Sequence, residues 1–183
     1  MKLTKENTAA LFVDMQEKMI PIMSGKEEVV NRSAVLLEGL KVLGIPMVFL
    51  QQYPEGIGEI VPALKEKMGD LKPFNKKTFS AMGDVAIIAE FERLRRTGIK
   101  NVLVCGVESH ICVLQSCIDL AAVGFQPVLV ADCIDSRCPF NKKIAMKRAV
   151  QDGAYLTTLE TALFELCVRS GTDEFRAISK LIK

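Results

Sequence analysis

The sequence has few of the side chains that build metal sites. It contains a single histidine, His110, and its six cysteines form no Cys-x-x-Cys pair. A protein zinc site usually needs three or four His, Cys or carboxylate ligands at short spacing. The sequence therefore predicts neither a metal site nor a metal cofactor.

Long apolar segments are also lacking. No apolar run approaches the ~18 residues that a membrane-spanning helix requires. Residues 1–7 contain no apolar core of the kind found in signal peptides. The cysteines are scattered, and several lie within apolar runs, as buried thiols do in a reducing compartment. These absences predict a cytoplasmic protein without a membrane partner.

An excess of one charge is missing as well. The chain has 24 Lys and Arg against 22 Asp and Glu, a formal net charge of +2. No basic stripe for nucleic acid follows from this balance, so we expect a small-molecule substrate and no nucleic-acid partner. The length of 183 residues, 49% of them hydrophobic, suits one domain with a sizeable core, spanning residues 1–183.

What the sequence does contain is a regular alternation of two patterns. Short apolar runs typical of strands alternate with longer stretches that have apolar residues at helical spacing. This order predicts an α/β fold with three layers, α/β/α, around a mainly parallel, Rossmann-like sheet of about six strands. Strands are expected at 8–13, 46–50, 101–105, 126–131 and 154–157, and helices at 27–43, 84–96, 112–124, 141–151, 158–167 and 172–182. Residues 51–72 are expected to form mainly a loop with one short helix.

Cys112 is expected at the turn where the strand over residues 101–105 leads into a helix. Sites in parallel sheets form beyond the carboxyl ends of strands. A helix N-terminus offers unpaired N–H groups and a positive dipole end, which favour a thiolate and can hold an oxyanion. This placement predicts a thiol pKa below the usual ~8.5. The alternative is a small buried hydrophobe, as most free cysteines are.

A cysteine nucleophile needs a proton acceptor. His110 lies two residues before Cys112 in a tight turn, so its side chain need not face the sulfur. Asp14 directly follows the first strand and is the natural base if the two strand ends are neighbours, although a carboxylate there could also cap a helix. Lys76 or Lys77 could stabilise both thiolate and carboxylate, or could be part of a solvated turn.

Three separated segments resemble motifs of the isochorismatase-like cysteine hydrolases, a family that includes nicotinamidases, pyrazinamidases and N-carbamoyl amide hydrolases. They are residues 11–16 (LFVDMQ), residues 76–81 (KKTFSA) and residues 106–113 (GVESHICV). Residues 130–137 also resemble a family segment. Residues 51–54 (QQYP), with the C-terminal region, are most similar to the isochorismatase domain-containing branch.

The resemblance implies roles for particular residues. Asp14, Lys76 and Cys112 would form the catalytic triad, with Lys77 as the fallback if the loop register slips by one. A cis peptide between Val107 and Glu108 would direct the backbone N–H groups of Glu108 and Cys112 at the oxyanion. The substrate pocket is expected to include Gln16, Gln51, Tyr53 and Val107.

The chain also departs from parts of the family. Nicotinamidases hold a metal with an Asp and several His residues, whereas this chain has Gln51 and Gln52 in the comparable region and no spare histidine. Isochorismatases that cleave a vinyl ether lack the cysteine. The resemblance thus implies hydrolysis of a C–N bond in a small amide or carbamoyl compound through a thioester, without a cofactor, by a homo-oligomer (a dimer or larger).

Two other hypotheses stay open. A catalytically inactive protein could keep the isochorismatase fold for interactions. Alternatively, Cys112 and Cys117 could act as a redox sensor, although five residues apart on a helix they point in different directions.

Overall fold

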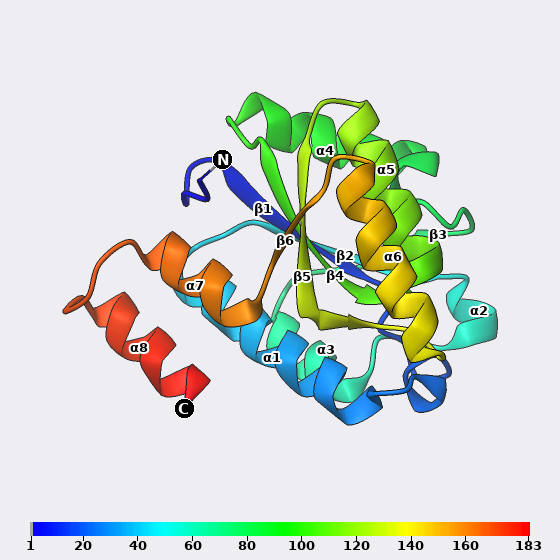
Figure 1. The fold of residues 1–183 in the computed structure, drawn as a ribbon, viewed down its shortest axis with the longest axis horizontal. Helices are drawn as coiled ribbons and strands as arrows, with labels where there is room; N and C mark the ends of the chain where they lie inside the picture. Colours follow the sequence, from blue (N-terminus) through cyan, green and yellow to red (C-terminus); the bar gives the residue numbers. More distant parts are fainter. Residues whose placement is uncertain (1) are drawn as a thin grey trace.

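The computed structural model describes residues 2–183, and its centre is a sheet of six parallel strands (Figure 1). The spatial order of the strands is β3-β2-β1-β4-β5-β6, and every neighbouring pair is parallel. The strands are β1 (Thr8–Val13), β2 (Met47–Gln52), β3 (Phe74–Lys76), β4 (Asn101–Val107), β5 (Gln126–Asp135) and β6 (Tyr155–Thr157).

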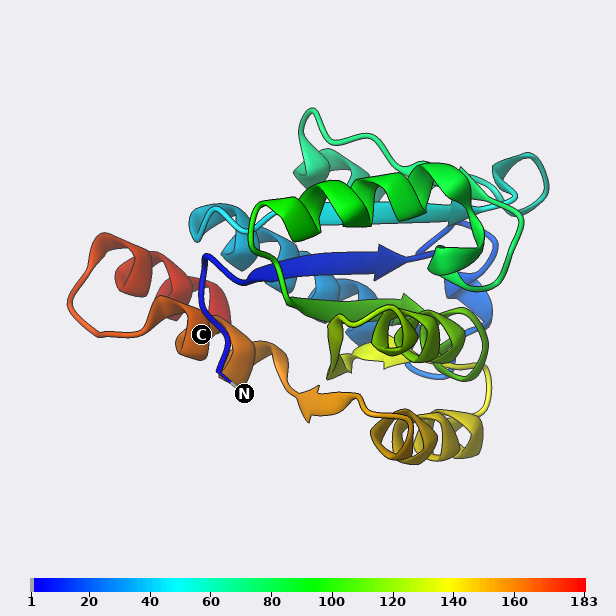
Figure 2. The same cartoon turned by 90° about the horizontal axis from the view of Figure 1, so that it is seen from above.

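Helices cover both faces of this sheet (Figure 2). They are α1 (Lys26–Val42), α2 (Pro54–Ile57), α3 (Pro62–Met68), α4 (Val85–Arg96), α5 (Leu114–Ala122), α6 (Pro139–Gln151), α7 (Leu159–Cys167) and α8 (Asp173–Ile182). One core joins the sheet to α1, α3, α7 and α8, and the other joins it to α4, α5 and α6. The predicted three-layer fold with a parallel sheet is confirmed.

Strand β1 shows how the sequence produces two cores. All six of its residues are buried, as expected for a central parallel strand covered on both faces. Because side chains alternate along a strand, Leu11 and Val13 face the layer of α4 to α6, while Phe12 faces the layer of α1. Phe12 stacks on Phe49 of β2 with ring centroids 4.5 Å apart. The strand is thereby fixed from both sides.

Some element boundaries differ from the sequence-based prediction. Strand β2 continues to Gln52, residues 54–68 form two short helices, and β3 was not predicted as a strand. A three-residue edge strand with sequence Phe-Asn-Lys has too few apolar positions to show a period. The helix expected to start at Cys112 begins earlier, with a π-helical turn (η3, Ser109–Val113) that leads into α5.

The strand order changes direction between β1 and β4, which are parallel neighbours: β2 and β3 follow on one side of β1, and β5 and β6 follow on the other side of β4. After β1 the chain enters the layer of α1, and after β4 it enters the layer of α5, so a crevice forms at their carboxyl ends. Gly106 makes this closeness possible. Its φ is +116°, and a Cβ there would lie 2.1 Å from the carbonyl oxygen of Val13. Only glycine fits, and the two strand ends are therefore side by side.

Candidate active site

Asp14 leaves the end of β1 with a φ of +49°, in the left-handed region that aspartate tolerates better than most residues. Its side chain is buried, with the residue only 2% exposed. The oxygen Oδ2 lies 2.7 Å from Nζ of Lys76. Burial of a charged pair is costly, so both members need further polar partners.

Lys76 reaches Asp14 from β3, two strands away in the sheet. Its Nζ donates to Asp14 Oδ2, to Gln52 Oε1 at 2.6 Å, and to the carbonyls of Thr78 and Phe79, both at 3.1 Å. An ammonium group has three protons, so these acceptors use its whole capacity. The lysine is therefore a fixed positive charge with no proton left for a substrate.

Asp14 is satisfied on one side only. Within residues 2–183, its Oδ1 is buried without a hydrogen-bond partner of standard geometry. Burial raises the pKa of Asp14, and the charge of Lys76 opposes that rise. The thiol of Cys112 is close enough to add a hydrogen bond, the smallest of these influences on the pKa. One oxygen of the carboxylate is thus held by Lys76, and the Cys112 thiol lies within hydrogen-bonding reach of the same carboxylate.

Cys112 lies in the π-helical turn after β4 and is also buried. Burial raises the pKa of its thiol to about 12, and the negative charge of Asp14 acts in the same direction. The charge of Lys76 lowers this pKa but does not outweigh the other two. The expectation of a thiol pKa below the usual value was wrong, because the helix terminus is buried beside a carboxylate. The resting thiol is neutral.

The turn before Cys112 is held by its backbone and by polar side chains. The Val107–Glu108 peptide is cis. The carbonyl of Glu108 accepts hydrogen bonds from the N–H groups of Ile111 and Val113, at 3.1 and 3.2 Å. The Glu108 carboxylate accepts from the backbone N–H and Nε of Arg137, both at 3.1 Å. These contacts fix the backbone of the turn that contains Cys112.

Neither ring nitrogen of His110 is bonded to the sulfur of Cys112. Its Nδ1 lies 3.0 Å from Oγ of Ser136, and its Nε2 lies 3.5 Å from Nδ2 of Asn141. Both ring nitrogens are thus directed at the segment after β5 and the start of α6. The side chain that interacts with the Cys112 thiol is therefore the Asp14 carboxylate and not the His110 ring.

The other residues predicted for the site are dispersed. Gln16 is buried, and its amide is bonded to the backbone of Gln52 and Gly58. Val107 packs in the core on the α1 side. Tyr53 is half-exposed, and Lys77 lies 5.9 Å from the centre of its ring, away from Asp14.

Gln51 and Gln52 point to opposite faces of β2. Gln52 contacts Lys76, whereas Gln51 lines a separate cavity of about 300 Å³ beside Ile60 and Met68 of the opposite layer. Gln52 was not predicted as a site residue. The alternation of side chains along the strand could have found it, because Leu50 and Gln52 share the face of the Cys112 core.

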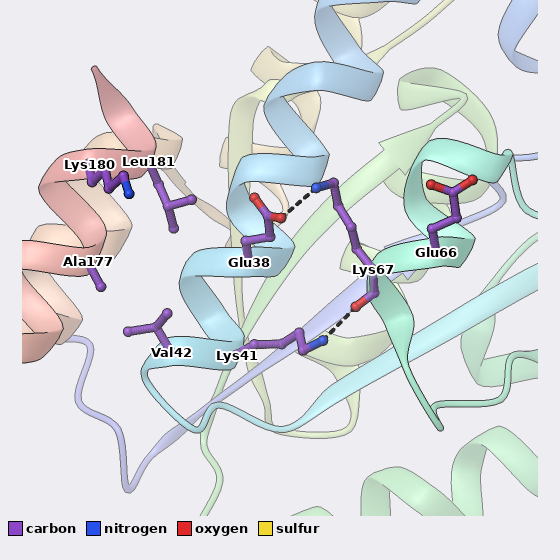
Figure 3. Close-up of a pocket in the computed structure, with 8 residues that line it drawn as sticks. All are labelled: Glu38, Lys41, Val42, Glu66, Lys67, Ala177, Lys180 and Leu181. Atoms are coloured by element: carbon purple, nitrogen blue, oxygen red, sulfur yellow. Dashed lines mark hydrogen bonds and ion pairs between the residues drawn. The ribbon is translucent and has the colours of Figure 1, made fainter.

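A larger hollow lies far from this chemistry. A groove of about 670 Å³ runs between α1, α3 and α8 (Figure 3). Glu38 and Lys67 form an ion pair of 2.5 Å across it, and Lys41 donates to the carbonyl of Lys67. Its lining includes no nucleophile, so the buried triad of groups and not this groove is the candidate site.

Metal-binding side chains do not gather at the site. Within the described part of the chain, no group of three His, Cys, Asp or Glu residues is arranged to hold an ion. In the same residues, no helix is both long enough and apolar enough to span a membrane.

Comparison with known proteins gives the family. The protein-family model of the isochorismatase domain matches residues 8–161 of the sequence. The secreted isochorismatase effector Isc1 of Phytophthora sojae (strain P6497) is 35% identical, over 97% of this chain and 85% of the effector. Isochorismatase domain-containing protein 2 of Bos taurus is 35% identical, over 96% of this chain and 83% of that protein.

A solved structure agrees with these relatives. The MAR1 ribonuclease from Caenorhabditis elegans superposes with a TM-score of 0.91 at 32% identity, covering 100% of this chain and 92% of the other. The family match covers most of the chain, and the relatives exceed 30% identity over nearly all of it. The chain therefore belongs to the isochorismatase family, as its three motifs predicted.

Proposed function

We propose that this protein is a cysteine hydrolase that cleaves a C–N bond of a small amide or carbamoyl compound through a thioester. One observation carries the proposal: the Asp14 carboxylate, whose buried Oδ1 has no standard hydrogen-bond partner among the described residues, is close enough to the Cys112 thiol to share a hydrogen bond with it. The other oxygen is held by Lys76. A carboxylate with one oxygen anchored and one free is suited to accept and return a proton.

The first half of the reaction forms the thioester. Cys112 Sγ attacks the carbonyl carbon while its proton passes to Asp14 Oδ1. The backbone N–H groups of Glu108 and Cys112 stabilise the resulting oxyanion. The C–N bond then breaks, and the proton on Asp14 goes to the nitrogen, which leaves as ammonia or an amine. Lys76 keeps its charge throughout and stabilises the negative charge shared by carboxylate and thiolate.

The second half releases the acid. Water gives a proton to Asp14 as its oxygen attacks the thioester carbon. The C–S bond breaks, the carboxylic or carbamic acid departs, and the proton on Asp14 returns to the sulfur. A raised pKa of Asp14 supports both halves, because it makes the carboxylate a better proton acceptor at neutral pH.

The rival functions have weaker support. Ribonuclease activity is named for the C. elegans relative. In this chain the net charge of +2 offers little attraction for RNA, and the one histidine faces away from Asp14 and Cys112. For a Cys112–Cys117 sensor, burial raises the pKa of Cys117 to about 12, and burial is the one cause of this shift, so within residues 2–183 Cys117 has no neighbouring carboxylate to take its proton as Cys112 has in Asp14. An inactive scaffold would not need an unsatisfied buried carboxylate.

The proposal also covers the domain organisation, cellular location and oligomeric state of the protein. We propose one domain over residues 1–183, a cytoplasmic location and a homo-oligomer. One relative is described as secreted, so fractionation of the native host is the measurement for location. Sedimentation analysis would measure the oligomer, and a monomer at micromolar concentration would contradict that part.

The test of the reaction is a panel of small amides, ureas and carbamoyl compounds, with ammonia or amine release as the readout. For a hydrolysed compound, Cys112→Ser should abolish turnover and leave the circular dichroism spectrum unchanged, since a hydroxyl does not ionise here. The wild type should show an acyl adduct on Cys112 by mass spectrometry after rapid quenching. Turnover in Cys112→Ser above a few per cent would refute the nucleophile assignment.

A further inference from the structure

Two glutamines link β1, β2 and β3 beside the Asp14–Lys76 ion pair. Gln16 follows β1, and its Oε1 accepts from the backbone N–H of Gln52 at 2.7 Å. Its Nε2 donates to the carbonyls of Gln52 at 3.0 Å and Gly58 at 2.6 Å. Gln16 is fully buried, and these bonds use its whole amide group. They fix the backbone of β2 at Gln52 relative to β1.

Gln52 continues the linkage to β3. Its Oε1 accepts from Lys76 Nζ at 2.6 Å, and its Nε2 donates to the carbonyl of Lys77 at 2.8 Å. Both ends of this side chain are therefore bonded to β3 or the residue that follows it. The backbone adds to the link, because the N–H of Tyr53 donates to the carbonyl of Lys76 at 2.9 Å.

We infer that Gln52 is a positioning residue that holds the Lys76 ammonium against Asp14 and thereby sets the ionisation of the Asp14–Cys112 pair. This inference rests on the proposed function, because it concerns the same three groups. The neutral amide is essential to the role. Gln52 accepts a hydrogen bond from Lys76 without adding a negative charge, so the full positive charge of Lys76 acts on Asp14 and on the thiol.

The sign of the effect follows from the charges. Lys76 lowers the pKa of the Cys112 thiol, whereas burial and the charge of Asp14 raise it. If Lys76 loses the Gln52 acceptor, Asp14 and the carbonyls of Thr78 and Phe79 still accept from its ammonium, but the side-chain contact that ties the ammonium to β2 is gone. We expect its position near Asp14 to be less fixed and its influence on the thiol to weaken. The thiol is then harder to ionise. A purely structural glutamine would alter stability but would leave the pH dependence of the sulfur unchanged.

The experiment measures alkylation of Cys112 by iodoacetamide between pH 7 and 10, with peptide mapping to separate it from the other cysteines. Gln52→Met keeps the length of the side chain and loses the acceptor. We expect its alkylation rate to fall about three- to tenfold at a given pH, which corresponds to an upward shift of the thiol pKa by up to one unit. Gln52→Glu keeps an acceptor but adds a negative charge, and its rate should fall at least as far.

The matched control is Gln51→Met, which removes the neighbouring amide on the opposite face of β2. Its alkylation profile should match the wild type within twofold. Profiles of Gln52→Met and Gln52→Glu that also match the wild type would overturn the inference, as would an equal change in Gln51→Met. If Gln52→Met does not fold, Gln52→Leu, which also removes the acceptor without adding a charge, takes its place, and a wild-type profile in that variant overturns the inference.

Failure of the proposed function would look different. Asp14→Asn removes a charge that raises the pKa of the thiol, so it should speed alkylation of Cys112. An unchanged rate in Asp14→Asn would show that the carboxylate and the sulfur are not coupled, and the proposed hydrolase mechanism would fail. A faster rate in Asp14→Asn with no effect in both Gln52 variants would reject the role of Gln52 alone.

Discussion

Asp14 and Asp135 are two buried carboxylates on either side of the same strand end. β1 and β5 flank β4, and the two aspartates are 2% and 3% exposed. Asp135 accepts hydrogen bonds from Ser24 Oγ at 3.0 and 3.2 Å and from the N–H of Gly25 at 2.6 Å, where α1 begins. Asp14 has an ion pair on one oxygen and no standard partner in residues 2–183 on the other.

The difference separates a structural carboxylate from a reactive one. Both oxygens of Asp135 are bonded, so a proton there would disrupt contacts that join β5 to the start of α1. In Asp14 the free oxygen can take a proton without breaking a bond. An unsatisfied buried oxygen is costly, and its presence beside a cysteine indicates a chemical role more than a structural one.

The largest expected effect is the difference between two single variants, each of which changes one of these carboxylates to an amide. Asp14→Asn should reduce hydrolysis by about 10³-fold or more, because no group can then move the proton between sulfur and leaving group. Asp135→Asn should keep most of the activity and lose about 1–2 kcal/mol of the free energy of unfolding. Steady-state rates and urea denaturation measure the two effects. Equal losses of activity in the two variants would contradict the assignment of a reactive role to Asp14 and a structural role to Asp135.

A second comparison concerns the adjacent lysines. Lys76→Met should reduce hydrolysis about 10²–10³-fold, because it removes the charge that stabilises carboxylate and thiolate. It should also cost about 3–5 kcal/mol of stability, since Asp14 loses its buried partner. Lys77→Met should change both quantities little, because Lys77 is exposed. A larger effect at Lys77 would mean that the site uses the other lysine.

The pH dependence of the sulfur sharpens the contrast between the aspartates. Because the thiol pKa is about 12, alkylation of Cys112 by iodoacetamide should rise by about tenfold per pH unit through pH 7 to 10 without levelling. The alkylation rate of a small thiol such as N-acetylcysteine stops rising near the pKa of that thiol, and this compound serves as the reference. Asp14→Asn should lower the thiol pKa and speed alkylation at pH 8, whereas Asp135→Asn should not. A wild-type profile that levels below pH 9 would contradict the raised pKa.

The smallest expected effect is that of a chelator. Dialysis against EDTA should leave hydrolysis unchanged, because the proposed mechanism uses only Asp14, Lys76 and Cys112. Metal analysis of the purified protein and re-addition of zinc or iron are the controls. Activity that is lost on dialysis and restored by one metal would show that a metal takes part in the reaction.

The sequence alone was enough to predict much of this molecule. Alternating apolar runs predicted the layers and the parallel sheet, because the burial of a central strand such as β1 requires apolar residues on both faces. Three short motifs predicted the family that the comparisons show. These features are visible in the sequence because they depend on local patterns of residue type.

Other features depended on strand order and on contacts between distant segments. Side-chain alternation could assign Gln52 to the face of the site, but its contact with Lys76 followed from the register of β2 and β3. The thiol pKa was predicted in the wrong direction, because the helix terminus is visible in the sequence while burial beside Asp14 is not. The sequence by itself determined which groups the site could use. Tertiary structure decided which of them are buried together, and burial controls their charge because removing water disfavours the ionised form.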